Sequence, residues 1–203
     1  MFDKIFNAIL AFLTRALYGP EVTYKDESMK GRHRLPGPAI IVSNHTCHLD
    51  GGILNTVFRK QKIHTLAAKD RFEQKFFGFM LRHTYCIPID RQNADTSWVH
   101  ESVRILKEGK DCVAIYPEGR HGSHRQQLPF HQGVAMLAFF VDVPVVVVYQ
   151  DGPHRLFHRS KVIVDAPMML LKDGGLTPEA LAANTELLQQ RMKDLMKELT
   201  DGE

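Results

Sequence analysis

The sequence alternates short runs of β-branched and apolar residues with longer stretches of helical periodicity. Runs with the length and composition of strands cover residues 39–43, 63–67, 85–89, 112–116, 144–149 and 161–165. Helical patterns lie near residues 51–59, 72–82, 95–108 and 131–141, and a last helix follows the capping residue Thr177. Several strand-like runs are apolar on both faces, as buried parallel strands are. The sequence therefore predicts an α/β fold with a mixed, largely parallel central sheet flanked by helices.

A length of 203 residues suits one well-buried core, so we expect a single domain. The net charge of +3 favours an anionic partner, such as a phosphate-bearing substrate, an acidic carrier protein or an anionic membrane surface. It is too small to indicate nucleic-acid binding. The 3 cysteines are widely spaced and include no CxxC pair, which predicts neither a disulfide framework nor a zinc ribbon and suits the reducing cytoplasm.

The first 19 residues have an amphipathic pattern. One helical face collects the apolar side chains of Phe2, Ile5, Phe6, Ile9, Leu10, Phe12, Leu13, Ala16 and Leu17. Asn7, Thr14 and Arg15 interrupt the apolar run, which is typical of neither a membrane-spanning helix nor a signal peptide. The apolar face could pack on the protein's own core or lie in a bilayer interface. We expect residues 1–19 to form this helix and residues 20–203 to form the α/β domain.

The segment NHTCHLD, residues 44–50, places several reactive polar groups between a predicted strand and a predicted helix. Binding and catalytic sites of α/β sheets form at such junctions. His45 and Asp50 would lie about 140° apart on a regular helix, so they can meet only if the loop or the first helical turn folds back. If they meet, the carboxylate would orient the imidazole, which could then take a proton from a hydroxyl group.

Other interpretations of this segment remain open. His45, His48 and Asp50 are possible metal ligands, but no second ligand cluster follows, so the sequence predicts no metal site. Cys47 could be a nucleophile activated by a neighbouring histidine. The segment could also be a polar turn without chemistry. The basic loop DGPHRLFHRS at 151–160 is compatible with the rim of a site or with plain solvated surface.

Two further strand-like runs end in charged residues and glycine. Asp90 and Arg91 follow one of these runs, and PEGR at 117–120 follows the next. A parallel sheet would bring these ends to one rim, where an arginine can bind phosphate through two hydrogen bonds and Gly119 lets backbone amides approach a ligand. Arg91 and Glu118 could instead form an ordinary ion pair.

Four blocks occur in the order that is typical of the glycerolipid acyltransferases. NHTCHLD resembles that family's motif of histidine, any four residues and aspartate, and YPEG at 116–119 matches its aromatic-Pro-Glu-Gly block. AKDRFEQKFFGFMLRHTYCIPIDR at 68–91 looks like the second block, and FHQGVAMLA at 130–138 followed by VDVPVVVV resembles the fourth. The His/Asp motif alone is weak, but four ordered blocks are specific.

The resemblance implies transfer of a fatty acyl chain from a thioester to the hydroxyl of a lysophospholipid, most closely 1-acylglycerol-3-phosphate, giving phosphatidic acid. It makes His45 the general base and Asp50 the residue that orients it. The donor would be an acyl carrier protein or coenzyme A thioester, with no metal and no organic cofactor. The absence of a GxSxG motif fits a reaction without a serine nucleophile. The residues expected to bind substrate are Asn44, Lys69, Arg91, Glu118, Gly119 and Arg120.

The third block departs from the family pattern. Where the family continues Gly-Thr-Arg-Ser, this chain has Gly119-Arg120-His121-Gly122-Ser123, so the arginine comes one position earlier. Arg120 could still reach a phosphate, or the pocket could serve another acceptor such as lyso-ornithine lipid. A thioesterase-type hydrolase and a non-catalytic lipid-binding protein are the remaining alternatives.

An enzyme that acylates lysolipids must reach a bilayer, because its substrate and its product both reside there. This implication favours the bilayer-interface interpretation of the N-terminal helix. We therefore expect a peripheral protein on the cytoplasmic face of the membrane.

Overall fold

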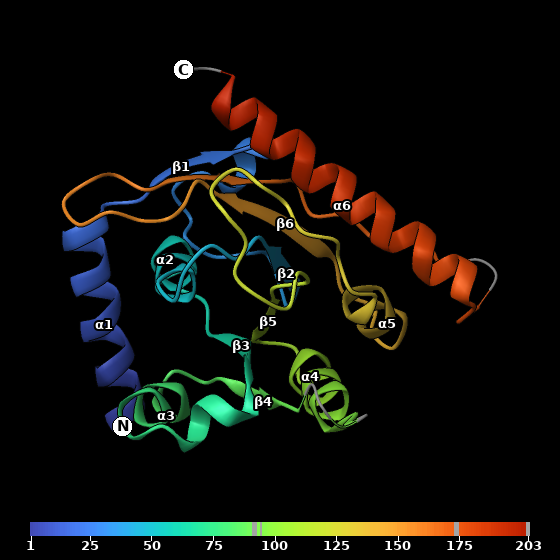
Figure 1. Ribbon diagram of the computed structural model, residues 1–203, viewed down its shortest axis with the longest axis horizontal. Helices are drawn as coiled ribbons and strands as arrows, with labels where there is room; N and C mark the ends of the chain where they lie inside the picture. The colour runs from blue at the N-terminus through green and yellow to red at the C-terminus, as the bar shows by residue number, and fades with distance from the viewer. Residues whose placement is uncertain (91–92, 94, 173–174, 202–203) are drawn as a thin grey trace.

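The computed structural model describes residues 1–90, 93, 95–172 and 175–201. In this part of the chain, 7 strands form one sheet in the order β1-β7-β6-β2-β5-β3-β4 (Figure 1). The strands are β1 (Glu21–Tyr24), β2 (Ile40–Ser43), β3 (Ile63–Ala68), β4 (Ile87–Ile89), β5 (Cys112–Ile115), β6 (Val145–Gln150) and β7 (Lys161–Val164). Among these described strands, β6 and β7 are antiparallel and the other neighbouring pairs are parallel. The predicted mixed, largely parallel sheet is therefore confirmed.

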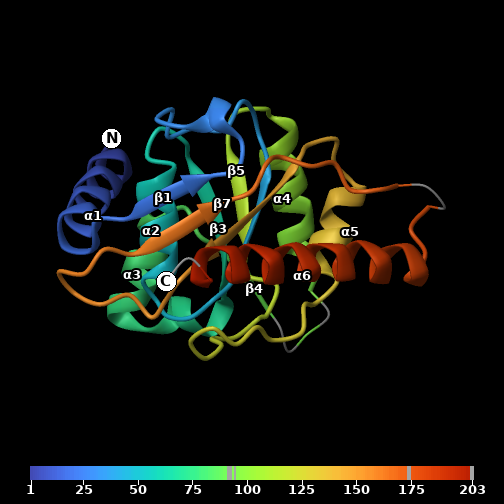
Figure 2. The same cartoon turned by 90° about the horizontal axis from the view of Figure 1, so that it is seen from above.

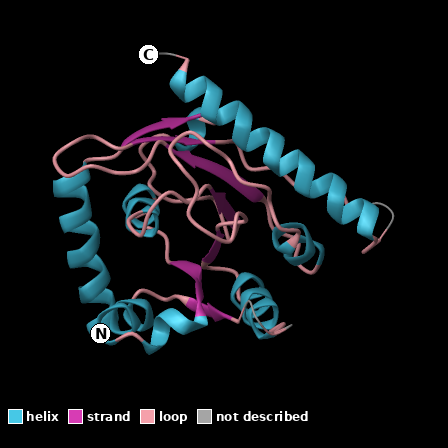
Figure 3. Ribbon diagram, in the orientation of Figure 1, coloured by secondary structure: helices cyan, strands magenta, loops and turns pink. Residues whose placement is uncertain are grey.

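Helices cover both faces of the sheet, which makes the fold a single α/β domain (Figures 1 and 3). α2 (Asp50–Val57) lies on one face, and α1 (Phe2–Tyr18) packs against α2. The other face is covered by α4 (Ser97–Lys107), α5 (Gly133–Phe139) and α6 (Pro178–Thr200). Figure 2 shows α6 lying across this face, with α4 and α5 beside it. The remaining elements are α3 (Lys75–His83) and the 3-10 turns η1 (Glu27–Met29) and η2 (Lys69–Glu73).

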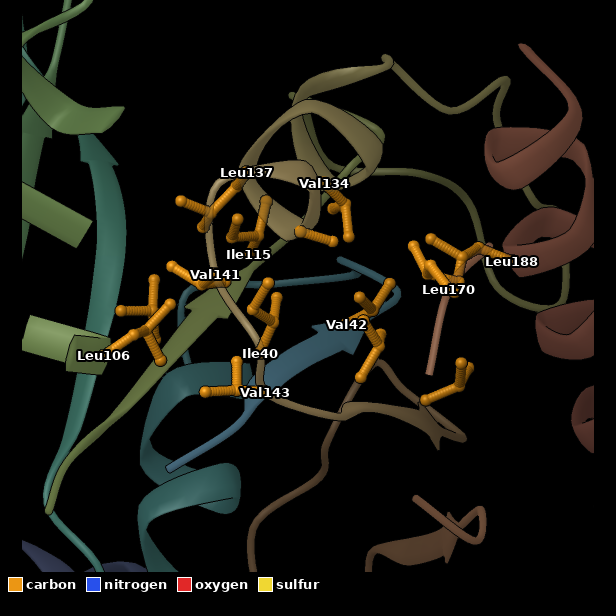
Figure 4. Packing of buried hydrophobic residues seen from close by; sticks show 14 of the residues in the cluster. Ile40, Val42, Leu106, Ile115, Val134, Leu137, Val141, Val143, Leu170 and Leu188 are labelled. Carbon is orange, nitrogen blue, oxygen red and sulfur yellow. The ribbon is translucent and has the colours of Figure 1, made fainter. Parts of the chain in front are cut away.

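The central strands are apolar on both sides because each side packs against helices. Ile40 and Val42 of β2 join the cluster beneath α4, α5 and α6 (Figure 4). Ile41, between them in the sequence, joins the cluster under α2 with Ile53 and Leu54. Each fully buried aliphatic side chain of this kind contributes about 1.5–3 kcal/mol. Burial on two faces therefore stabilises the strands that position the polar loops at their ends.

The six predicted strands correspond to β2 through β7, and the predicted helices match α2 to α6 to within a few residues. No sequence pattern indicated β1, because EVTY alternates exposed and half-buried positions instead of forming an apolar run. β1 is an edge strand that pairs with β7, far along the chain. β1 forms only by pairing with β7, and a pattern within residues 21–24 cannot indicate a partner so far along the chain.

The predicted N-terminal helix is present as α1, and polar side chains attach it to the rest of the protein. Thr14 is buried against α2. Asn7 donates a hydrogen bond to the carbonyl of His83 at 2.6 Å, and Nδ1 of His83 lies 2.7 Å from the carboxylate of Asp3. Much of the predicted apolar face points to solvent instead, through Phe2, Ile5, Ile9, Phe12 and Leu13. No described helix combines the length and the apolar composition needed to cross a membrane.

Candidate active site

The polar segments meet at one edge of the sheet. β2 lies between β5 and β6 and runs parallel to both, so the carboxyl ends of these strands lie side by side (Figure 1). Residues 44–49 connect β2 to α2, residues 116–132 connect β5 to α5, and residues 151–160 follow β6. This edge is where α/β sheets place their sites.

His45 and Asp50 are in contact, as the general-base hypothesis requires. Nδ1 of His45 lies 2.8 Å from Oδ2 of Asp50. The same oxygen accepts hydrogen bonds from the backbone N–H groups of Thr46 at 2.6 Å and Cys47 at 3.0 Å. Asp50 is the first residue of α2. Its carboxylate accepts the N–H groups of Thr46 and Cys47, which lie in the loop before the helix. These bonds fold the loop around the carboxylate and bring together two side chains that a regular helix would hold apart.

Asp50 is ionised although it is 0% exposed. Burial raises the pKa of its carboxyl, but the contact with His154 and the hydrogen bonds from His45 and the backbone of Cys47 outweigh burial and hold the pKa well below its ordinary value. An ionised carboxylate only accepts hydrogen bonds. Nδ1 of His45 therefore carries a proton, and Nε2 is left with the lone pair that a general base uses.

Other rings hold the imidazole of His45 in place. It stacks on Tyr116, with ring centroids 4.2 Å apart and planes inclined by 17°. The ring of His121 meets it edge-on at 4.1 Å. Burial, and then the neighbouring His45 and His48, lower the pKa of His121, which favours its neutral form beside the base. The base is thus fixed in orientation before any substrate binds.

His45 also lines a cavity of about 700 Å³. Apolar side chains in its wall are Leu66, Ile89, Trp98, Ile115 and Val134. Basic and imidazole side chains in its wall are His48, Arg71, Arg120, His121 and His131. A cavity with this combination of side chains can hold an acyl chain together with an anionic head group.

Of the residues predicted to bind substrate, some line the cavity and others do not. Gly119 and Arg120 line the cavity. Gly119 has a φ of 68°, and a Cβ at this position would lie 3.1 Å from the ring of His131, so a larger residue would be strained there. Lys69 is exposed, with Nζ 3.6 Å from Oδ2 of Asp90. Arg91 lies outside the described residues.

Asn44 and Glu118 support the loop that carries His45. Asn44 donates to the carbonyl of Gln150 at 2.9 Å and accepts the N–H of Gln150 at 2.8 Å, which ties the loop to the end of β6. Glu118 is 4% exposed, and burial raises its pKa to about 7 although the backbones of Leu128 and His45 donate hydrogen bonds to it. That these two residues contact substrate stays a prediction.

The metal and cysteine hypotheses gain no support from the geometry. In the described part of the chain, the group that brings three possible ligand atoms within 4.8 Å of one another is Cys47, Asp50 and His154, not His45, His48 and Asp50. Burial, and then the charge of Asp50, raise the pKa of the Cys47 thiol, so it stays protonated and donates to Oδ1 of Asp50 at 3.3 Å. The thiolate, not the thiol, is the nucleophile and the metal ligand.

Sequence reasoning did not single out Arg71, His131 or His154. Arg71 lies two positions after Lys69 in the second block, so its basic charge in that block was a usable signal. His131 was within the fourth block, but nothing indicated that it would face the same cavity as His45. His154 lies beyond all four blocks, in the loop after β6, and no local pattern connects it with Asp50.

A histidine that is oriented by a buried carboxylate and lines a partly apolar, partly basic cavity defines a site for activating an alcohol toward an acyl donor. The family model described as Acyltransferase matches residues 23–150, which span all four blocks. The chain belongs to this family, and it is an acyltransferase.

Similar proteins include a 1-acyl-sn-glycerol-3-phosphate acyltransferase of Bacillus subtilis, 31% identical over 166 residues that cover 79% of this chain and 82% of the relative. A protein of the same name from Escherichia coli is 26% identical, with 82% of this chain and 72% of the relative covered. The crystal structure of the 1-acyl-sn-glycerophosphate acyltransferase of Thermotoga maritima matches with a TM-score of 0.66 at 17% identity, over 97% of this chain and 78% of that one. This structural match confirms the fold.

Proposed function

We propose that this protein transfers a fatty acyl chain from a thioester to the free hydroxyl of 1-acylglycerol-3-phosphate, giving phosphatidic acid. The observation that carries the proposal is the 2.8 Å contact between His45 and Asp50 at a cavity with apolar and basic side chains. The names of the relatives from Bacillus subtilis and Escherichia coli support the choice of acceptor.

In the proposed reaction, Nε2 of His45 takes the proton of the acceptor hydroxyl while the hydroxyl oxygen attacks the carbonyl carbon of the thioester. The carbon–sulfur bond then breaks, and the imidazolium gives the proton to the departing thiolate. The products are an ester and a free thiol. Asp50 stabilises the imidazolium without taking the proton itself. Binding both reactants together supplies the proximity that this direct transfer requires, and no covalent enzyme intermediate forms.

The donor in this proposal is an acyl carrier protein or coenzyme A thioester. Both are anionic, and the net charge of +3 and the arginines at the cavity favour such a partner. The proposed chemistry uses a base, an alcohol and a thioester, so it needs no metal and no organic cofactor.

A panel of lysolipid acceptors with one labelled acyl thioester tests the proposal, read out as product mass. We expect 1-acylglycerol-3-phosphate to give the highest kcat/KM. Preference for lyso-ornithine lipid would keep the acyltransferase class and replace the acceptor. Free fatty acid released equally fast without acceptor would indicate a hydrolase, and tight lysolipid binding without turnover would indicate a lipid-binding protein.

Arg120→Ala should raise the KM for 1-acylglycerol-3-phosphate by about 10- to 100-fold, because a charge-assisted hydrogen bond contributes roughly 1.5–3 kcal/mol. The KM for the thioester and the rate with an uncharged monoacylglycerol should change little. We expect the same pattern for Arg71→Ala, which alters another cavity residue, and for Arg91→Ala from the sequence alone.

Arg104→Ala is the matched control, because Arg104 lies on the exposed side of α4 and pairs with Glu101 and Glu108. It should leave both Michaelis constants unchanged. An equal rise in the KM of donor and acceptor for Arg120→Ala would contradict a phosphate-binding role.

We also propose that the protein binds the cytoplasmic face of the membrane as a peripheral protein, through residues 1–19 and α3. The proposed lipid-binding face consists of Phe2, Ile5, Ile9, Phe12 and Leu13 of α1 and Phe76, Phe77 and Phe79 of α3, all exposed. The two helices adjoin, since the rings of Phe6 and Phe79 are 5.7 Å apart. The ring of Phe77 also lies 5.3 Å from the ring of His48 at the cavity. A lysolipid could therefore pass from the bilayer to His45 along apolar surface.

Exchanging Ile5, Ile9 and Phe12 together for serine should lower partitioning onto anionic phospholipid vesicles by at least about 100-fold, because each buried side chain of this size contributes roughly 1.5–3 kcal/mol. Co-sedimentation with the vesicles measures this. These side chains are exposed, so the fold should persist, whereas deleting α1 would also remove its contacts with α2 and α3.

The control replaces three exposed apolar side chains elsewhere, Phe140, Leu171 and Leu187, with serine. It should sediment like the unaltered protein. Equal loss of vesicle binding in both triple variants would contradict the proposed lipid-binding face.

A further inference from the structure

The loop that follows β6 lies directly on the catalytic loop. Gln150 is bound at both its backbone N–H and its carbonyl by the side chain of Asn44. At Gly152, a Cβ would overlap Oγ1 of Thr46, so the Thr46 side chain can lie this close to the backbone of residue 152 only because that residue is glycine. His124 donates a hydrogen bond from Nδ1 to the carbonyl of Gly152 and so attaches the same loop to the segment that follows β5. Because the two loops pack together in this way, the side chain of His154 lies buried next to Asp50.

The side chain of His154 is 0% exposed, and its Nε2 lies 3.2 Å from Oδ1 of Asp50. The approach is off the line of an ideal hydrogen bond. Because an ionised carboxylate can only accept, the ring nitrogen facing it must carry a proton. Asp50 therefore lies between two imidazoles, with His45 at Oδ2 and His154 at Oδ1. None of the sequence motifs includes this second imidazole.

We propose that His154 is a positioning residue for the catalytic base. Its Nε2–H holds Oδ1 of Asp50, so that Oδ2 stays directed at Nδ1 of His45. This inference rests on the proposed function, in which His45 and Asp50 act on the acceptor hydroxyl. His154 does not touch the reacting atoms and acts through Asp50 alone.

The same contact means that the charge of Asp50 acts on two imidazoles instead of on His45 alone. Other titratable groups near this pair are the thiol of Cys47 on the same loop, Tyr116 and Glu118 after β5, and His121 against His45. Burial raises the pKa of both Cys47 and Tyr116, so neither carries charge at neutral pH. Without His154, more of the Asp50 charge acts on the His45 imidazole and favours its protonated form. The base would then become available only at higher pH.

A comparison of His154→Phe with His154→Gln tests the proposal. Phenylalanine keeps a planar ring and removes the donor, and we expect kcat to fall about 10- to 100-fold, the cost of a misplaced catalytic group. The acidic limb of the kcat/KM profile should move up by about half a pH unit or more. The KM for acceptor should change little. Glutamine places an N–H near the position of Nε2, so it should restore the limb and most of kcat.

Three results would overturn the proposal. One is a folded His154→Phe variant with unchanged kcat and pH profile. Another is equal loss in the two variants with no shift of the limb, which a purely structural role would give. The third is stoichiometric zinc in the purified protein that both variants lose, because Cys47, Asp50 and His154 would then be metal ligands.

Nitrogen-15 NMR of the unaltered protein decides the contact without any substrate and without a variant that has to fold. We expect the proton of His154 on Nε2, and a proton on Nδ1 alone would overturn the proposal. Because this measurement needs no turnover, it also separates failure of the inference from failure of the proposed function, which the acceptor panel reports.

Discussion

His45→Ala is expected to lower kcat for acyl transfer by about 10³-fold, within the range for loss of a general base. Nε2 of His45 is the nitrogen left free by the contact with Asp50, and no other imidazole in the described cavity wall is paired with a carboxylate in this way. Asp50→Asn should cost a similar factor, because the amide cannot stabilise the imidazolium. Both are measured as initial rates with a labelled thioester, alongside thermal unfolding to confirm that each variant is folded.

The chain provides a matched control for this loss. Nε2 of His64 lies 3.0 Å from Oδ2 of Asp111, so this is a second histidine–aspartate pair of similar geometry. It lies at the amino ends of β3 and β5, at the opposite edge of the sheet from His45. His64→Ala should leave kcat unchanged. A His45→Ala variant with near-normal kcat would remove the base from the mechanism.

The second large effect is expected for Gly152→Ala. The added Cβ would occupy the place of Oγ1 of Thr46, which donates to Asp50 at 3.1 Å. Either the loop after β6 moves away or Thr46 rotates off the carboxylate, and both displace groups that fix Asp50. Overpacking of this kind costs about 1–3 kcal/mol of unfolding free energy, and a shift of the base should lower kcat by about 100-fold.

Gly37→Ala is the control, since a Cβ at Gly37 meets no atom within 4 Å. Chemical denaturation and initial rates measured on both variants separate the steric effect from the general effect of adding a methyl group. If Gly152→Ala retained normal stability and normal kcat, the close packing of the two loops would not be needed for the site.

The central strands of the sheet were predictable because they are buried by apolar side chains that stand next to each other in the sequence. β2 illustrates this, since Ile40, Ile41 and Val42 form an unbroken apolar run and each packs on one face or the other. The orientation of β7 against β6 was not predictable. The residues of a strand do not indicate whether it pairs parallel or antiparallel with its neighbour. The antiparallel pairing here depends on the path of residues 151–160, which connect the two strands.

The catalytic pair was found through the motif, but its geometry was not. Spacing alone sets His45 and Asp50 apart, and only the backbone amides of Thr46 and Cys47 explain how the loop closes. His154 could not have been found this way, because its contact with Asp50 is a property of how the loop after β6 folds. A resemblance identifies residues that lie within a family's motifs, whereas a contact made by the folding of a distant loop is seen only in the structure.

The tie between Asn44 and Gln150 has a consequence for synthesis of the chain. Chains emerge amino end first, so His45 and Asp50 are made well before β6, Gly152 and His154. Until those later residues are synthesised, β2 lacks its neighbour β6. The loop that carries the motif also lacks the hydrogen bonds between Asn44 and Gln150. A prematurely terminated chain would contain the motif residues, but His45 would not be positioned to accept a proton. Incomplete chains should therefore leave cellular thioesters intact, and the capacity to acylate should appear only with the finished fold.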